Sequence, residues 1–179
     1  WVLKILKKIA ANPFYSFIVL LIVGLLLYFN MLNTTFFSDD FVIIYKLQHH
    51  DWNQGAFFRP LSDISIYLDI VCWGIKSIYF HLTNVLIHIF SSFLVYLVFR
   101  EIFVFFKINT DNKEGYALIA SFLFLIYPFH NEAVIWILGR GILLATFFTL
   151  LSFWFYFKSE RGRSFLLLSS IFYCLALLG

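Results

Sequence analysis

Long apolar runs separated by short polar stretches occupy most of this 179-residue chain. We predict that five of these runs are helices in a membrane, at residues of about 14–32, 79–106, 116–128, 133–157 and 164–179. An α-helix needs ~20 apolar residues to cross the hydrocarbon core of a bilayer, and the first run meets that requirement. A secretory signal peptide has a shorter apolar core of about 7–15 residues, so the first run is better explained as a membrane span.

The composition indicates a surface that faces lipid. Hydrophobic residues make up 62% of the chain and charged residues 13%, against roughly 45–50% and 25% in soluble domains. So few polar side chains cannot cover a water-facing surface. We therefore predict an all-α, polytopic transmembrane helical bundle. Because the last apolar run reaches residue 179, we expect residues 1–179 to be the N-terminal part of a single longer membrane module.

The sequence gives little support for nucleic-acid binding or for a cysteine-based metal or redox site. The thirteen Lys and Arg residues are scattered, without the basic stripe typical of nucleic-acid binding, so we expect no nucleic acid partner. The two cysteines, Cys72 and Cys174, form no metal or redox motif. We expect no required cofactor, and the sequence does not exclude a divalent metal ion.

Residues 33–78 form the longest stretch that contains polar residues, and we predict two short amphipathic helices there, lying against the membrane face. Pro60 suits the first position of the second helix. From there, apolar residues recur at helical spacing on one side, whereas Ser62, Ser65 and Asp69 form a polar stripe on the other. The lysine-containing residues 1–12 predict a further amphipathic helix on the inner membrane surface.

The basic residues predict an orientation. With the predicted spans, nine Lys and Arg residues fall on the side of the N-terminus and four on the other side. The positive-inside rule then predicts a cytoplasmic N-terminus, and a loop of residues 33–78 on the outer side. We expect an integral, multi-pass protein of a bacterial inner membrane.

An adjacent pair of carboxylates, Asp39 and Asp40, follows the first predicted span. Such a pair can be a solvated helix start, since acids favour the positive end of a helix. It can also be catalytic, because a carboxylate with a raised pKa can remove a proton from an attacking hydroxyl. Arg59 is similarly ambiguous: its guanidinium can extend to the membrane interface or bind a phosphate group.

Polar residues within the predicted spans form two further groups. His81, Asn84 and His88 share one helix face, and we expect them mainly to form hydrogen bonds between helices rather than to bind metal.

The second group is His130, Glu132 and Arg140. On a continuous helix, Glu132 and Arg140 share a face with Trp136 and lie ~12 Å apart along the axis, so both would line one cavity. An Arg within a span needs an anion, which a lipid phosphate or an acid on another helix could supply.

Five short motifs occur in a recognisable order. They are Phe-Phe-Ser-Asp-Asp at 36–40, Phe-Arg-Pro-Leu-Ser at 58–62, Phe-His-Leu-Thr-Asn-Val-Leu-Ile-His at 80–88, Tyr-Pro-Phe-His-Asn-Glu-Ala-Val-Ile-Trp at 127–136, and Gly-Arg at 139–140. This order resembles the N-terminal half of the tetratricopeptide-repeat O-mannosyltransferases and their bacterial relatives in the GT-C superfamily of glycosyltransferases.

The resemblance implies transfer of a sugar, such as mannose, from a polyprenyl-phosphate donor to a hydroxyl of a protein, glycan or lipid, with inversion at the anomeric carbon. It implies a catalytic acid pair, Asp39 and Asp40, with Asp39 as the base. The residues implied to contact substrate are Arg59, His81, His130, Glu132 and Arg140. The alternative hypothesis is a transporter or lipid flippase, which also needs charged residues around a cavity.

Overall fold

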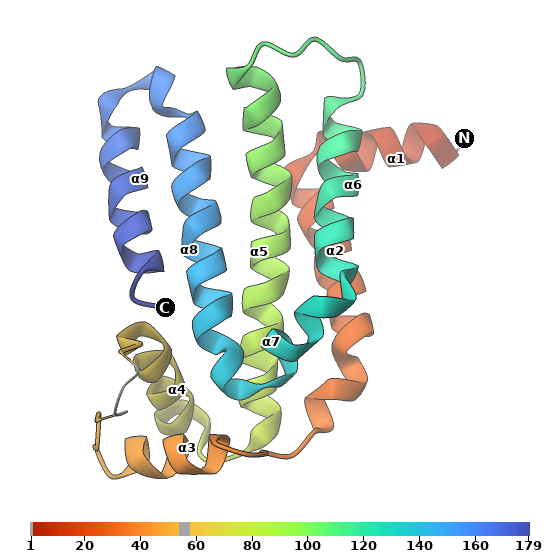
Figure 1. The fold of residues 1–179 in the computed structure, drawn as a ribbon. Coiled ribbons are helices and arrows are strands. Elements are labelled where there is room, and N and C mark those ends of the chain that lie inside the picture. Colours follow the sequence, from red (N-terminus) through yellow and green to blue (C-terminus); the bar gives the residue numbers. More distant parts are fainter. Residues whose placement is uncertain (1, 54–57) are drawn as a thin grey trace.

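The computed structural model describes residues 2–53 and 58–179, and within these ranges it is a bundle of helices without strands (Figure 1). The longer helices are α1 (Val2–Ala11), α2 (Pro13–Tyr28), α3 (Asp40–Gln48), α4 (Pro60–Trp73), α5 (Ser77–Phe105), α6 (Lys113–Ile126), α8 (Arg140–Phe157) and α9 (Arg163–Ala176). Short helical turns complete the chain, namely η1 (Phe29–Asn33), η2 (Pro128–His130), α7 (Asn131–Ile135), η3 (Ile137–Gly139) and η4 (Ser159–Arg161). The prediction of an all-α helical bundle is confirmed.

Three of these segments are long and apolar enough to cross a membrane. They are Pro13–Asn33, Ser77–Phe105 and Ile137–Phe157. The bent pair Lys113–Ile126 and Pro128–Ile135 adds a fourth if it counts as one span, and α9 is a shorter apolar helix. The protein is therefore an integral membrane protein. The five predicted segments overlap α2, α5, α6, α8 and α9, apart from the break described below, and the prediction that all five cross the membrane stays a prediction.

Helix α5 is the centre of the bundle. It lies between α8 on one side and α2 and α6 on the other, while α9 packs on the far side of α8 (Figure 1). The core between α5 and its neighbours contains Leu20, Tyr28, Ile89, Leu125 and Leu143. Because α5 is covered on several sides, its polar residues face protein rather than lipid.

At one end of the bundle, α1 lies at a large angle to α2 and does not form one straight helix with it (Figure 1). The break is local chemistry: the side chain of Asn12 accepts a hydrogen bond of 2.9 Å from Phe14 N, and Pro13 occupies the first helical position. The hydroxyl of Tyr96 on α5 then donates to Ala10 O at 2.7 Å. A separate short N-terminal helix is therefore present, as predicted.

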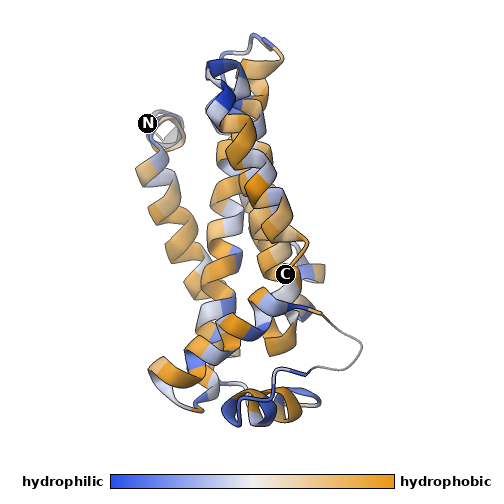
Figure 2. Cartoon of the chain, turned by 90° about the vertical axis from the view of Figure 1, so that its left-hand side faces the viewer, coloured by the Kyte–Doolittle hydropathy of each residue, from blue (hydrophilic) through white to orange (hydrophobic). Residues whose placement is uncertain are grey.

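At the opposite end, α3 and α4 lie beside the ends of the membrane helices (Figure 1). Helix α4 is amphipathic as predicted, but its polar side faces the bundle. Ser62, Asp63 and Asp69 are buried, whereas Ile64 and Leu68 are exposed. This arrangement suits a helix whose outer face meets lipid, and Figure 2 shows that apolar residues predominate along the long helices of the bundle.

The predicted continuous helix from residue 133 to 157 is wrong. The chain leaves the helical conformation at Trp136, whose φ and ψ are −72° and 123°, and α8 begins only at Arg140. The break lets η3 pack Ile137 against Phe80, Ile66 and Leu47 of the α3–α4 end. Glu132, Trp136 and Arg140 therefore do not share one helix face.

Candidate functional site

One pocket at the α3–α4 end, the Asp39 pocket, has a volume of about 370 Å³. Helices α3 and α4 and the broken segment before α8 supply its walls. The lining residues are Asp39, Val42, Ile43, Lys46, Arg59, Ser62, Asp63, Trp136, Leu138 and Ile142. Two of the predicted site residues, Asp39 and Arg59, thus come together in one hollow.

The two acids of the Asp39–Asp40 pair face different surroundings. Asp39 is exposed and lines the pocket, whereas Asp40 has 0% of its surface exposed. The turn before α3 sets this difference: Ser38 has a φ of 54°, and Phe37 N donates to Oδ2 of Asp40 at 3.2 Å. Asp40 therefore holds the turn that presents Asp39.

Burial raises the pKa of the Asp40 carboxyl above its ordinary value, and the charge of Asp39 adds to this shift. The hydrogen bond from Phe37 N opposes the shift by stabilising the carboxylate. The buried acid consequently binds a proton more readily than a free aspartate does.

Cationic side chains lie in the same pocket as Asp39. Arg59 immediately precedes α4, and Lys46 is in the last turn of α3, where its Nζ donates to Asn53 O at 2.9 Å. Asp63 lies one turn after Arg59. Burial raises the pKa of the Asp63 carboxyl, and the nearby Arg59 charge opposes the shift. The pocket therefore offers an accessible carboxylate beside positive charge.

Arg140 lies elsewhere, in a buried polar cluster that joins α4, α5 and α8. Its guanidinium forms a salt bridge with Asp69 and donates from Nε to Asn84 Oδ1 at 2.8 Å. It also donates from Nη2 to Phe80 O at 2.8 Å, and from Nη1 to Ser65 Oγ at 3.3 Å. The anion that meets Arg140 in the structure is thus an acid on another helix, and its contact with substrate stays a prediction.

The remaining predicted residues are distributed around the pocket rather than inside it. His81 is buried, and its Nε2 lies 2.9 Å from Thr34 Oγ1. Glu132 lines a neighbouring hollow with Phe37, Ser38, Ile135 and Trp136. Trp136 lines both hollows, so Glu132 is adjacent to the Asp39 pocket.

His130 lines a third cavity, of about 170 Å³, within the bundle. Its ring centroid lies 5.3 Å from that of His88, and His88 Nε2 contacts Leu125 O at 3.2 Å. Asn84 donates to the carbonyl oxygens of Val134 and Trp136 at 3.2 and 3.0 Å. The expectation that Asn84 and His88 form hydrogen bonds between helices is confirmed.

No three His, Cys, Asp or Glu side chains converge as metal ligands within residues 2–53 and 58–179. The prediction that no metal is required stays a prediction.

Lys46 and Asp63 are members of the pocket that the sequence did not suggest. Asp63 could have been found from its spacing of four residues after Arg59, which places the two side chains on one side of the start of α4. Lys46 had no such signal, because only the packing of α3 against α4 brings it to the same hollow.

The sequence of this chain is similar to those of several known proteins. The chain is 34% identical over 103 residues to the protein O-mannosyl-transferase TMTC1 of Mus musculus, which covers 57% of this chain and 10% of that protein. It is 33% identical over 103 residues to TMTC3 of Homo sapiens, with 58% and 10% covered. It is 32% identical over 163 residues to tmtc2 of Xenopus laevis, with 79% and 18% covered.

Part of this chain is homologous to protein O-mannosyl-transferases. The chain spans only about a tenth to a fifth of the length of these three relatives. No family model matches the chain, and no solved structure matches it significantly. These three relatives are named protein O-mannosyl-transferases, and the similarity to each covers between 57% and 79% of this chain.

Proposed function

We propose that this chain forms the N-terminal part of a GT-C-type membrane enzyme that transfers a sugar from a polyprenyl-phosphate donor to a hydroxyl group. The single observation that carries the proposal is the pocket in which Asp39 lies with Arg59 and Lys46. Mannose is the proposed sugar and a protein hydroxyl the proposed acceptor, because the homologues are named protein O-mannosyl-transferases.

Asp39 is the proposed general base. Its carboxylate takes the proton of the acceptor hydroxyl as the hydroxyl oxygen attacks the anomeric carbon. The bond between that carbon and the donor phosphate oxygen breaks, and its electron pair leaves with the lipid phosphate. Attack opposite the leaving group inverts the anomeric centre.

Arg59 and Lys46 are the proposed partners of the leaving phosphate. A guanidinium fork matches phosphate oxygens, and a fixed cation stabilises negative charge that grows during bond cleavage. Arg140 is a poorer choice for this role, since its guanidinium already meets Asp69 and Asn84 in the buried cluster. The lipid tail of the donor would then lie against the apolar outer surface at this end.

The proposed location of this pocket is the outer side of the membrane, with the N-terminus in the cytoplasm. The support is the distribution of charge: basic residues are more frequent at the end that carries α1 and the α5–α6 and α8–α9 turns. A bacterial inner membrane is the proposed compartment.

The test uses full-length protein in membranes supplied with radiolabelled polyprenyl-phosphate mannose. We expect label to move to an acceptor, and Asp39→Asn to reduce the rate by at least about 100-fold, the usual contribution of a general base. Asp51→Asn is the matched control, because Asp51 is an exposed acid outside the pocket. Its rate should equal that of the wild type.

The outcomes separate the hypotheses. Equal transfer by the wild type and Asp39→Asn would refute the role of Asp39. If the donor is translocated across sealed vesicles without loss of its sugar, the alternative of a lipid flippase replaces the enzyme. Recovery of both variants as folded protein in detergent excludes misfolding as the cause of lost transfer.

A further inference from the structure

Another pocket, of about 300 Å³, lies at the end of the bundle opposite to Asp39. Its walls are the last turns of α5 and α8, the start of α6, the start of α2 and the α8–α9 turn. The lining residues are Pro13, Leu97, Arg100, Glu101, Val104, Lys113, Trp154, Lys158 and Arg161. Nothing in the proposed transfer reaction uses this pocket.

The charge in this pocket is unbalanced. Arg100, Lys113, Lys158 and Arg161 face a single acid, Glu101. Glu101 is already shared, because its Oε2 lies 2.7 Å from Nη2 of Arg161 and its Oε1 lies 3.9 Å from Nζ of Lys158. Neither Arg100 nor Lys113 forms a salt bridge with any acid in the part of the chain that the structure describes. The pocket therefore carries four basic groups against one acid, an excess of positive charge.

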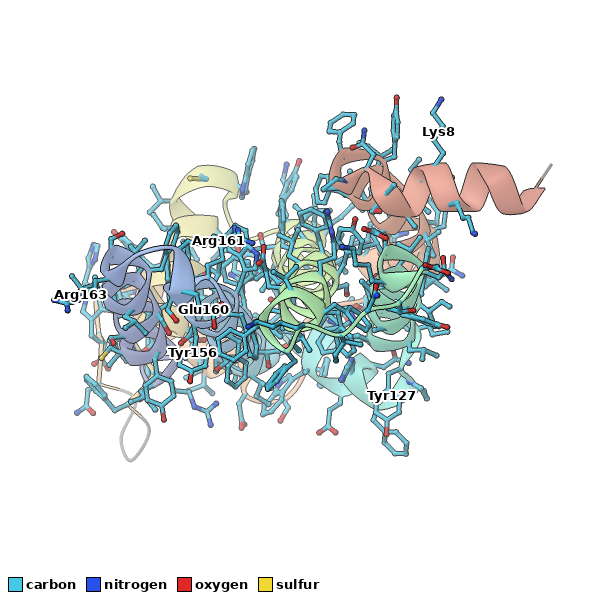
Figure 3. The ribbon with its side chains drawn as sticks, turned by 90° about the horizontal axis from the view of Figure 1, so that it is seen from above. Lys8, Tyr127, Tyr156, Glu160, Arg161 and Arg163 are labelled. Atoms are coloured by element: carbon cyan, nitrogen blue, oxygen red, sulfur yellow. The ribbon has the colours of Figure 1, made fainter. Side chains whose placement is uncertain are left out.

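The cations converge although they are distant in the sequence. Lys158 is largely covered and lies with its Nζ 3.5 Å from the centroid of the Trp154 ring. Burial lowers the pKa of Lys158, a cost that an anion nearby would reduce. Figure 3 shows Arg161 above the bundle, between α8 and α5, whereas Arg163 points away from it at the edge.

A general excess of basic residues on one membrane side does not require this convergence. Basic side chains that extend into water, as Arg163 does, produce such an excess equally well. Two guanidinium groups and two ammonium groups around one hollow instead match the oxygens of a phosphate, which accept hydrogen bonds from several donors at once.

We infer that this pocket binds a phosphate group, supplied either by the headgroup of an anionic membrane lipid or by a soluble phosphate. The lipid source has a natural route, since the pocket lies at the ends of α5 and α8, where headgroups surround a membrane-spanning helix. Binding there would tie the α5–α6 and α8–α9 turns together at the end remote from the proposed active site.

The test compares full-length wild-type protein with the double variant Arg100→Gln/Lys113→Gln, which leaves both contacts of Glu101 intact. One arm measures by native mass spectrometry how much phosphatidylglycerol stays bound to protein released from mixed phosphatidylglycerol–phosphatidylcholine nanodiscs. The other arm titrates inorganic phosphate onto protein in phosphatidylcholine nanodiscs and measures thermal stability. We expect binding to weaken about fivefold for each charge removed.

Two further variants make the result specific. Arg100→Lys/Lys113→Arg keeps both charges and should bind like the wild type, and Arg163→Gln removes an exposed charge at the same end and should also leave binding unchanged. Retention of phosphatidylglycerol identifies a lipid headgroup, and saturable stabilisation by inorganic phosphate identifies a soluble ligand. The inference is overturned if the double variant binds both probes like the wild type, or if Arg163→Gln weakens binding as much.

Discussion

Burial of the Arg140 guanidinium is tolerated because acceptors surround it. Asp69 supplies a carboxylate, Asn84 an amide oxygen and Phe80 a backbone carbonyl, all from helices other than α8. A charge in a low-dielectric interior is costly when unpaired, so the cluster holds α4 and α5 against the start of α8. The cluster therefore connects three helices at the end of the bundle that carries the candidate site.

We expect Asp69→Asn to destabilise the protein by about 3–5 kcal/mol, because it leaves the Arg140 charge buried without its acid. Thermal unfolding in detergent measures the loss. The double variant Asp69→Asn/Arg140→Met removes the charge as well and should recover part of the stability. Equal stability of Asp69→Asn and the wild type would show that the salt bridge does not hold these helices.

The matched control for this cluster is Arg161→Gln. Arg161 also pairs with an acid, Glu101, but its side chain is 51% exposed. Exposed ion pairs contribute about 0–1 kcal/mol, so the control should unfold within that margin of the wild type.

At single residues, the sequence predicted chemistry better than location. Asp39 and Arg59 were expected at one site, and they do line one pocket. Both residues lie in the segment between two spans, which keeps them at the same end of the bundle. Arg140 was expected to share a cavity with Glu132. That expectation assumed a continuous helix, and no pattern in the sequence indicates which of several acids an arginine will meet.

Among the elements, the spans follow from apolar length alone, whereas the break at Trp136 does not. A segment rich in apolar residues fits a helix as well as an irregular turn, and Gly139 is the only local signal between Glu132 and Arg140. Tertiary packing decides the matter, since η3 fills the space between α4 and α5 with Ile137. The sequence likewise did not indicate which side of α4 packs against the bundle. In water the apolar side of an amphipathic helix faces the protein, whereas next to lipid the polar side can do so.

Gly139 makes this break testable. A Cβ built on Gly139 would lie 2.4 Å from Ala133 O and 2.8 Å from Ala133 Cα, which are backbone atoms that cannot rotate away. We expect Gly139→Ala to destabilise the protein by about 1–3 kcal/mol, the range for overpacking, and to lower the proposed transferase activity by shifting the wall of the pocket.

Gly162→Ala is the control for that substitution. Gly162 also lies in a turn between helices, but a Cβ there has no neighbour closer than 3.8 Å, and its φ of 161° is extended backbone. Thermal unfolding of both variants measures the difference. If Gly139→Ala is as stable as Gly162→Ala, the close approach of η3 to α7 is not a feature of the protein.

For the whole molecule, the two ends of the bundle differ in chemistry. The α3–α4 end carries the candidate transfer site, with Asp39 and Asp63 among its lining residues. The other end carries the basic pocket and α1. A membrane that holds the apolar helices between these ends must separate the two pockets into different compartments. The orientation of the chain therefore decides which compartment would supply the proposed acceptor.

That orientation is accessible by thiol labelling. The native cysteines, Cys72 and Cys174, are both exposed and are first replaced by Ser. Asp51→Cys then reports on the α3–α4 end, and Asp111→Cys reports on the α5–α6 turn, since both positions are exposed in loops.

With a membrane-impermeant maleimide and intact cells, we expect Asp51→Cys to react and Asp111→Cys to react only after the membrane is permeabilised. The physical reason is the excess of Lys and Arg at the Asp111 end, which the positive-inside rule retains in the cytoplasm. Labelling of both sites after permeabilisation shows that each thiol is reactive. The reverse pattern in intact cells would place the Asp39 pocket in the cytoplasm, where an acceptor hydroxyl would have to come from a cytoplasmic molecule.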